Sequence, residues 1–295
     1  MLDLNRLAAL RELSLRGTIA AAAEAMGYTP SAVSQQIAAL EREAGVALTV
    51  RSGRTLVLTP AGQRLVARAH ELLDTMERAE AELHDAAAQT TGTVRLAAFQ
   101  SAALTLVPGA LLRLRESHPG IRVVVTQSEP GAALADAWAR EFDLVAAEEY
   151  PHHAAPHYPG VERRPLVSDE LALAVGGPWG DARSIRDLAA APWVMEPSGT
   201  SSRHFAEQRC RVAGFEPDVR FETADLQAHV LLIRRGLAVG ILPGLMADHA
   251  GLRDCTVPLE GPPRRTVFTA MRESSRLDPA VAAVRAALEA EAADY

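Results

Sequence analysis

Two short helix patterns separated by a single glycine constrain the fold of this chain more than any other feature of its sequence. Thr18 can cap a helix over residues 19–26, and Gly27 can supply the left-handed turn that ends it. Thr29 and Pro30 then start a second helix, with a capping hydroxyl followed by a first-turn proline. Two short helices joined by a tight glycine turn predict a helix-turn-helix.

The second helix has one apolar face, which indicates how the segment packs. Val33, Ile37 and Leu40 fall at i, i+4 and i+7, so they form one buried stripe. A preceding helix over residues 3–15 supplies further leucines for the same core. The segment therefore predicts a three-helix domain.

The opposite face of the second helix carries small hydroxyls and an amide where Glu and Lys are usual. A recognition helix enters the major groove of DNA by its N-terminal residues, where long side chains would hold it away from the bases. Ser can bond phosphates or base edges, Gln can bond adenine in a bidentate manner, and the helix dipole favours a nearby phosphate. The alternative is the solvated face of an ordinary helix. We expect DNA contacts from Thr29, Ser31, Ala32, Ser34 and Gln35.

A β-hairpin is predicted directly after these helices, because two β-rich runs flank Gly53. Such a wing would carry Arg51 and Arg54 to the DNA backbone or into a minor groove. Residues 1–62 hold six arginines against five acidic residues, a net charge of +1 in a chain of net charge -7. Since duplex affinity usually rests on phosphate neutralisation, one copy should bind weakly and several copies are expected.

A long helix over residues 60–88 provides a means of bringing copies together. Its apolar residues are spaced 4, 3, 4, 3 and 4 apart, which is the pattern of a coiled-coil seam in a homodimer or homotetramer. The alternative is a helix that packs on its own chain. Residues 89–93 break the pattern and predict a hinge. The expected dimerisation residues are Leu65, Ala69, Leu72, Met76, Ala79 and Leu83.

The stretch from GTIAAAAEAMGY to LTPAGQ resembles the LysR-type transcriptional regulators, in order and spacing, over residues 4–65. Thr49 and Val50 stand where that family commonly has Phe and Glu, and Gln35 stands where Arg is frequent. Wing packing and operator preference therefore need not follow the family. The resemblance assigns helix-turn-helix and wing positions to Ala22, Ala23, Thr29, Ser31, Ser34, Gln36, Leu40, Glu41, Gly45 and Arg51.

The rest of the chain alternates short apolar strands with helices, which predicts parallel α/β sheets. A looser resemblance, in GTVRLAAF, EFDLVAA and RRGLAVGILP, implies two α/β lobes like those of periplasmic solute-binding proteins, with an effector between them. The expected fold class is thus α/β, with an N-terminal winged helix-turn-helix domain, a long linker helix and a two-lobed effector domain. The domains are 1–59, 60–92 and 93–295, with lobe I formed by about 93–162 and 268–295 and lobe II by about 163–267.

Hydroxyl and amide side chains follow several of the predicted strands. In open α/β sheets, ligands sit beyond the carboxyl ends of the strands, and backbone N–H groups and hydroxyls at such ends suit a carboxylate. Helix capping would also explain each serine taken singly. The candidate effector-binding residues are Gln100, Ser101, Thr126, Ser128, Ser198, Thr200, Ser201 and Thr223.

No other constellation matches a known catalytic or metal motif. His152, His153 and His157 lie near two glutamates, but their spacing fits no metal site, so an exposed or pocket-lining loop is favoured. EPSGTSS lacks the spacing of a nucleophile elbow, and GGPWG lacks a phosphate-loop lysine. Cys210 and Cys255 are too few for a disulfide framework, and small buried hydrophobes are favoured over a redox pair. We expect no catalytic residues, no metal and no cofactor.

The sequence thus predicts a sequence-specific, ligand-responsive transcription factor. The start of the chain lacks the basic region of a signal peptide, and no apolar run approaches the ~20 residues of a membrane span, so a cytoplasmic protein is expected. Effector binding would change the spacing of paired helix-turn-helix domains through differential affinity for two states. Expected partners are a double-stranded DNA operator, a small-molecule co-inducer such as a carboxylate, further copies of the chain and RNA polymerase. A solute-binding receptor without a DNA role would need export, and an α/β-fold enzyme would need a convergent nucleophile and base.

Overall fold

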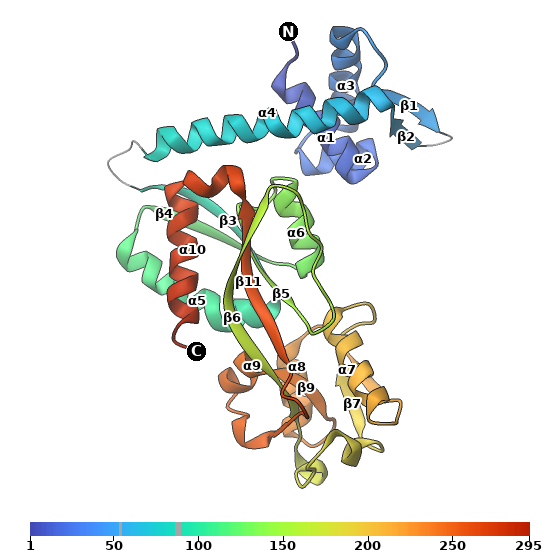
Figure 1. Ribbon diagram of the computed structural model, residues 1–295, viewed down its shortest axis with the longest axis vertical. Helices are drawn as coiled ribbons and strands as arrows, with labels where there is room; N and C mark the ends of the chain where they lie inside the picture. The colour runs from blue at the N-terminus through green and yellow to red at the C-terminus, as the bar shows by residue number, and fades with distance from the viewer. Residues whose placement is uncertain (53–54, 86–89) are drawn as a thin grey trace. The chain divides into compact units, whose positions relative to one another are not determined.

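The computed structural model of the protein describes residues 1–52, 55–85 and 90–295, which form two compact units (Figure 1). One unit is built mainly from helices α1 to α4 and the first hairpin, and the other from most of the remaining elements. No helix among the described residues is long and apolar enough to cross a membrane.

The predicted helix-turn-helix is present, and its caps are those that the sequence indicates. The Thr18 hydroxyl accepts a hydrogen bond of 3.2 Å from the Ala21 N–H, and the Thr29 hydroxyl accepts one of 3.2 Å from the Ala32 N–H. Gly27 adopts the left-handed conformation with φ of 67°. The three helices are α1 (Leu4–Arg16), α2 (Ile19–Ala25) and α3 (Pro30–Ala44).

The wing follows α3 as an antiparallel hairpin of β1 (Thr49–Ser52) and β2 (Thr55–Leu58), as predicted. Its turn, residues 53–54, lies outside the described residues. Ala22 and Ala23 are at most 1% exposed, which lets the helices approach closely over a core that includes Leu40.

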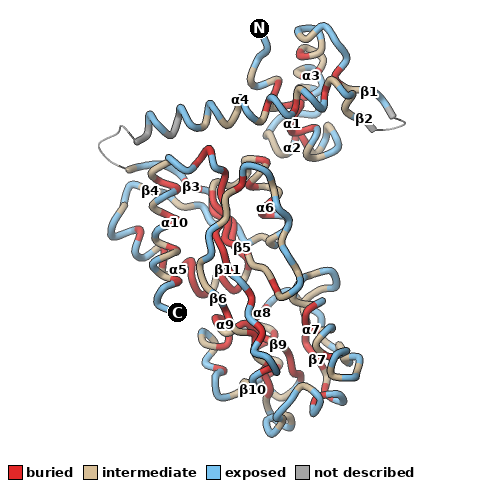
Figure 2. The backbone as a smooth tube through the Cα atoms, viewed as in Figure 1, coloured by how far each residue is buried: buried red, intermediate tan, exposed pale blue. Residues whose placement is uncertain are grey.

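The predicted linker helix is α4 (Pro60–Asp85); residues 86–88 and Gln89 of the expected hinge lie outside the described residues. Its heptad stripe divides into two parts, and Figure 2 shows buried backbone positions of α4 where it adjoins the helix-turn-helix. Leu65 and the fully buried Ala69 pack into the helix-turn-helix core of the same chain. Farther along, Leu72 is 47% exposed, Met76 44% and Leu83 75%, and Ala79 is also exposed. Packing against the core of the same chain thus explains why the first apolar residues of the stripe are buried, but it leaves the later ones exposed.

The second unit contains a seven-stranded mixed sheet with the order β10-β6-β11-β5-β3-β4, and β9 also pairs with β6. The pairings β3–β4 and β3–β5 are parallel, as predicted, but all pairings of β6 and β11 are antiparallel. The expectation of parallel sheets is therefore confirmed for β3–β4 and β3–β5 and wrong for β6 and β11. The strands are β3 (Gly92–Ala98), β4 (Ile121–Gln127), β5 (Leu144–Glu149), β6 (Val161–Ala174), β9 (Gly240–Pro243), β10 (Thr256–Pro258) and β11 (Arg264–Arg272).

The reason for the error lies in β6 and β11, two long strands that lie side by side. The first half of β6, VERRPLV, is charged and mostly half-buried, so its sequence lacks the apolar run of a predicted strand, which begins only near Leu171. β11 begins with two arginines, so its sequence also lacks the continuous apolar pattern of a predicted strand. Register along the pair shifts between Val267 and Phe268.

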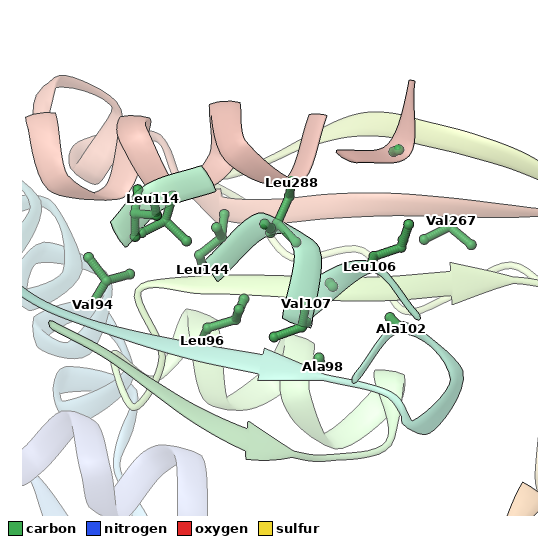
Figure 3. Close-up of a cluster of buried hydrophobic side chains, with 14 of the residues drawn as sticks. Val94, Leu96, Ala98, Ala102, Leu106, Val107, Leu114, Leu144, Val267 and Leu288 are labelled. Atoms are coloured by element: carbon green, nitrogen blue, oxygen red, sulfur yellow. The ribbon is translucent and has the colours of Figure 1, made fainter. Parts of the chain in front are cut away.

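Hydrophobic side chains gather into separate cores along this unit. One core packs α5 (Gln100–Ser117) and α10 (Pro279–Ala292) against β3 and β5, with Leu96, Leu106 and Leu288 in its interior (Figure 3). Another surrounds the fully buried Trp193. The remaining elements are α6 (Pro130–Trp138), β7 (Pro192–Met195), α7 (Ser201–Val212), β8 (Asp218–Glu222), α8 (Leu226–Arg234) and α9 (Gly244–His249).

Candidate functional site

The first turns of α3 present the predicted polar face to solvent. Ser31, Ser34 and Gln35 are exposed, whereas the apolar stripe that includes Val33 and Ile37 is at most 2% exposed. The helix is therefore fixed to its domain by one face and leaves short polar side chains free on the other.

The N-terminal end of α3 is ordered by its own hydroxyls. Thr29 caps the helix, and its hydroxyl oxygen lies 3.0 Å from that of Ser31. Ala32 follows in the first turn and is half-buried. Because the first N–H groups of a helix lack intrahelical acceptors, this end offers donors and a positive dipole to an anion.

A hollow of about 610 Å³ lies between α2, α3 and the wing. Thr18, Ser34 and Arg51 contribute to its wall, so a recognition-helix serine and a wing arginine share one concave surface. Arg54, the second predicted wing arginine, lies outside the described residues.

Glu41 connects α3 to the wing. Its Oε1 accepts three hydrogen bonds of 2.9 Å each, from the Leu48 N–H, the Thr49 N–H and the Thr49 hydroxyl. Thr49, one of the departures from the resembled family, thus makes a bond of its own. The sequence placed Glu41 in the motif without giving it this role, since the partners lie beyond the helix.

The second unit has a cavity of about 260 Å³ where several loops converge. It is bordered by the end of β5, the starts of α6 and α7, the residue after β7 and the loop 154–156. The lining residues are Glu129, Pro130, Gly131, Ala132, Glu148, Ala154, Ala155, Pro156, Glu196, Gly199, Thr200, Ser201 and Ser202.

Two of the predicted effector-binding residues, Thr200 and Ser201, line this cavity. Together with Ser198 they also line an adjoining hollow of about 260 Å³. The Thr200 hydroxyl caps α7, accepting from the Arg203 N–H at 3.3 Å and donating to the Pro197 carbonyl at 3.0 Å. The other five candidates, Gln100, Ser101, Thr126, Ser128 and Thr223, are not among the lining residues of either hollow.

Gln100 connects the starts of two helices. Its Nε2 donates to Asp225 Oδ1 at 3.0 Å, and its Oε1 accepts from the Leu226 N–H at 2.8 Å. Thr223 lies near this bridge, and its hydroxyl accepts from the Asp225 N–H at 3.1 Å. Thr126 is exposed on the edge strand β4, and Ser128 follows it half-buried.

Ser101 is 1% exposed and belongs to a buried network around Arg265. Arg265, itself 1% exposed, donates to the Ser101 hydroxyl at 2.9 Å and to Asp169 Oδ2 at 2.8 Å, and it also bonds Glu148. Sequence reasoning missed Arg265, because its partners are distant in the chain.

Carboxylates dominate the electrostatics of the cavity. Burial, together with the charges of Glu148 and Glu129, raises the pKa of Glu196 to about 8 against the opposing effect of Arg265. Burial also raises the pKa of Glu129 and of Glu148, the latter opposed by Arg265. No basic side chain is among the residues that line this cavity.

The histidine loop and the two cysteines are the other groups that the sequence singles out. Three lining residues, 154–156, come from this loop, as expected for a pocket-lining segment, and His153 packs edge-on against His204 with ring centroids 4.4 Å apart. Within the described residues, no group of three or more His, Cys, Asp or Glu side chains could hold a metal ion. Cys210 is buried, Cys255 is half-buried, and both are free thiols.

Two protein-family models match this chain. The model described as "Bacterial regulatory helix-turn-helix protein, lysR family" matches residues 4–63, and the model described as "LysR substrate binding domain" matches residues 87–293. The two matches correspond to the segments with the exposed polar helix and with the acidic cavity.

Individual proteins agree with the family models. The transcriptional dual regulator GltC of Bacillus subtilis is 26% identical over 284 residues, which cover 94% of this chain and 93% of GltC. A probable hydrogen peroxide-inducible genes activator of Streptomyces viridosporus is 30% identical over 231 residues, 75% of this chain and 71% of that protein.

Solved structures share the fold. A full-length OxyR from Pseudomonas aeruginosa superposes with a TM-score of 0.69 at 19% identity, covering 98% of this chain and 95% of that one. Full-length CbnR, solved with its target DNA, gives a TM-score of 0.54 at 22% identity, covering 98% and 100%.

Proposed function

This chain belongs to the LysR family of bacterial DNA-binding transcriptional regulators, and on that premise we propose that it reads its operator with α3 and the wing while a small molecule in the acidic cavity adjusts its activity. The observation that carries the DNA part is the exposed polar face at the N-terminal end of α3. Its short side chains allow close approach to base edges.

Each candidate DNA contact has a distinct role in this proposal. Gln35 reads a base edge, Ser31 and Ser34 bond base edges or phosphates, and the first turn with Thr29 and Ala32 approaches a phosphate. Arg51 and Arg54 contact the backbone or the minor groove, which adds affinity without reading a base in the major groove.

Oligomerisation is the second part of the proposal. The described seam residues Leu72, Met76 and Leu83 are exposed on α4, so a second copy can cover them. A homodimer, or a homotetramer of two such pairs, would place several weakly charged domains on one operator and so offset the small charge of each. The proposed setting is the cytoplasm, where the protein can also meet RNA polymerase.

The effector part rests on the cavity. Thr200 and Ser201 stand at the N-terminal end of α7, where backbone N–H groups and a hydroxyl suit a carboxylate. An effector bound there would act by differential affinity for two arrangements of the regulator. Gln100, Ser101, Thr126, Ser128, Ser198 and Thr223 remain candidates for contact in another arrangement of the lobes.

The test is a footprint of the full-length protein on the DNA upstream of its own gene, repeated at rising salt, with Gln35→Ala as the variant. Gln227→Ala is a matched control, because Gln227 is exposed on α8 in the other unit. We expect protection over two or more half-sites spaced by helical turns, weakened in Gln35→Ala only. If Gln35→Ala binds the operator with unchanged specificity, Gln35 does not read a base and its assigned role is wrong.

A further inference from the structure

The charge of the cavity indicates which chemical class of effector it accepts. Resting on the proposed function of that cavity, we infer that the effector is a small zwitterion. Its protonated amino or guanidinium group faces Glu129, Glu148 and Glu196, and its carboxylate lies at the N-terminal end of α7.

The three carboxylates reach the cavity from separate parts of the fold. Glu129 immediately precedes α6, Glu148 lies in β5, and Glu196 follows β7. They do not form a consecutive acidic run on a solvated surface, since the fold brings them together around one hollow. The lining contains no arginine, and the chain contains no lysine at all.

The arginines that approach the wall do not balance these charges. Arg203 donates from Nη1 to the backbone carbonyl of Glu196 at 3.2 Å, but its guanidinium pairs with Glu207 and Glu222, and Arg163 pairs with Glu149. Arg265 is shared between Glu148 and Asp169, so one positive charge stands against two negative ones. In the described part of the chain, the carboxylates of Glu129 and Glu196 have no hydrogen-bonding or ion-pair partner. When these carboxyl groups are ionised, the wall therefore carries a surplus of negative charge, with Glu148 and Glu196 half-buried and Glu129 exposed.

The protonation behaviour of the wall agrees with this surplus. The pKa of Glu196 lies at about 8, chiefly because burial disfavours its charged form, and the pKa of Glu129 is raised for the same reason. A ligand cation close to these oxygens would favour their ionised forms and offset the cost of charging the half-buried Glu196. An anionic group placed beside them would increase that cost.

The opposite end of the cavity suits the other pole of a zwitterion. Ser201 and Ser202 begin the twelve-residue helix α7, whose first N–H groups have no acceptors within the helix. Thr200 uses its hydroxyl as the cap and also bonds the Ser202 hydroxyl at 3.1 Å, which leaves the Ser201 hydroxyl and the helix end for a carboxylate. A volume of about 260 Å³ lies below the ~300–1,000 Å³ of drug-sized sites and fits a molecule the size of an amino acid.

The experiment is a thermal-shift and calorimetric titration of the full-length protein. The probes are the standard L-amino acids and the ω-amino acids from 3-aminopropanoate to 6-aminohexanoate. Each is paired with the carboxylate of equal chain length that lacks the amino group. We expect at least one zwitterion to raise Tm while its paired carboxylate does not.

Variants of the cavity test whether the zwitterion binds at the acidic wall and at the N-terminal end of α7. Glu196→Gln keeps the shape of the side chain and removes its charge, and we expect it to weaken the responding zwitterion at least ~10-fold, which corresponds to about 1.4 kcal/mol. Ser201→Ala tests the other pole. Glu116→Gln, an exposed glutamate on α5, is the matched control and should bind as the unaltered protein does.

Three results would contradict the inference, and they differ in whether the effector part of the proposed function fails with it. If paired carboxylates bind as well as zwitterions, or if no probe binds, the zwitterion assignment is wrong while the operator footprint still stands. If a zwitterion binds but neither Glu196→Gln nor Ser201→Ala weakens it, the cavity is not its site. The effector part of the proposed function then fails as well.

Discussion

The carboxylate oxygen Oε1 of Glu41 accepts two hydrogen bonds from Thr49, one from its backbone N–H and one from its hydroxyl, each 2.9 Å long. Because Glu41 lies in the last turn of α3 and Thr49 begins β1, this contact fixes the wing relative to the recognition helix. A third bond to the same oxygen comes from Leu48.

Removing this acceptor should loosen the wing. Glu41→Ala leaves two part-buried backbone donors without their acceptor, so we expect the free energy of unfolding to fall by roughly 1–3 kcal/mol. Chemical denaturation checks this, with Glu24→Ala, an exposed glutamate on α2, as the control. A loss no larger than that of the control would show that water replaces Glu41 without cost.

Substitutions in the buried part of the α4 stripe should affect folding of the domain, and substitutions in its exposed part should affect association with a second copy. Met76→Glu introduces a charge at a position 44% exposed, so the monomer should remain folded while the dimer dissociates more readily. Light scattering coupled to size-exclusion chromatography measures the change in mass. Val212→Glu, at an apolar position 77% exposed at the end of α7, is the control. An unaltered mass for Met76→Glu would place the contact elsewhere.

The two kinds of DNA contact should differ in their dependence on salt. Arg51→Ala should weaken binding to operator and random DNA alike, and it should reduce the slope of log K against log salt by about 1. Gln35→Ala should leave that slope unchanged and reduce discrimination between operator and mutated sites, by ~1–3 kcal/mol for the base pair that it reads. Anisotropy titrations over a salt series measure both quantities. Equal slopes for Arg51→Ala and the unaltered protein would show that Arg51 makes no phosphate contact.

The DNA-binding unit was largely predictable, because its signals are local. Thr18, Gly27 and Thr29 each act on residues within one helical turn, so the caps and the turn follow from short windows of sequence. The acidic cavity was not predictable in this way. Glu129, Glu148 and Glu196 lie in three separate segments, and only the packing of β5, α6 and β7 brings them together.

Strands that contain charged residues were also difficult to predict from the sequence. Arg265 looks like a surface residue in PPRRTV, yet it is 1% exposed because Asp169, Glu148 and Ser101 surround its guanidinium. A buried charge with partners far away in the chain leaves no periodic pattern. The first half of β6 has no apolar pattern either, because it is rich in charged residues, and its pairing with β11 is what makes it a strand.

Cys210 should be inert in the folded protein, although one relative is a probable peroxide-inducible activator. Burial, together with the nearby charges of Glu207 and Glu216, raises the pKa of its thiol to about 12, so the reactive thiolate is scarce at neutral pH. Iodoacetamide should modify Cys210 slowly in native protein and rapidly after denaturation, as mass spectrometry of its peptide would record. Rapid native labelling would show that the site opens.

The pH dependence of the free energy of unfolding should show the raised pKa of Glu196. Its folded-state pKa of about 8 lies above the ordinary value of 4.5, so the folded protein holds a proton that the unfolded chain releases between these values. Stability contributed by this proton is therefore lost as pH rises towards 8. Glu196→Gln mimics the protonated group, so its stability relative to the unaltered protein should grow between pH 6 and 9 by roughly 1–3 kcal/mol, given ~1.4 kcal/mol per pKa unit and partial hydration of the carboxyl.

Denaturation curves of the two proteins at several pH values measure that difference. The groups whose charges act on Glu196 are Glu148 and Glu129, which raise its pKa, and Arg265, which lowers it. Glu116→Gln should show a constant offset from the unaltered protein over the same range, because its carboxyl is exposed. If the Glu196→Gln curve runs parallel as well, the carboxyl is already ionised throughout that range and the cavity wall is better solvated than its burial indicates. A difference that grows with pH would instead mean that the wall holds an unbalanced charge, which a cationic ligand would neutralise.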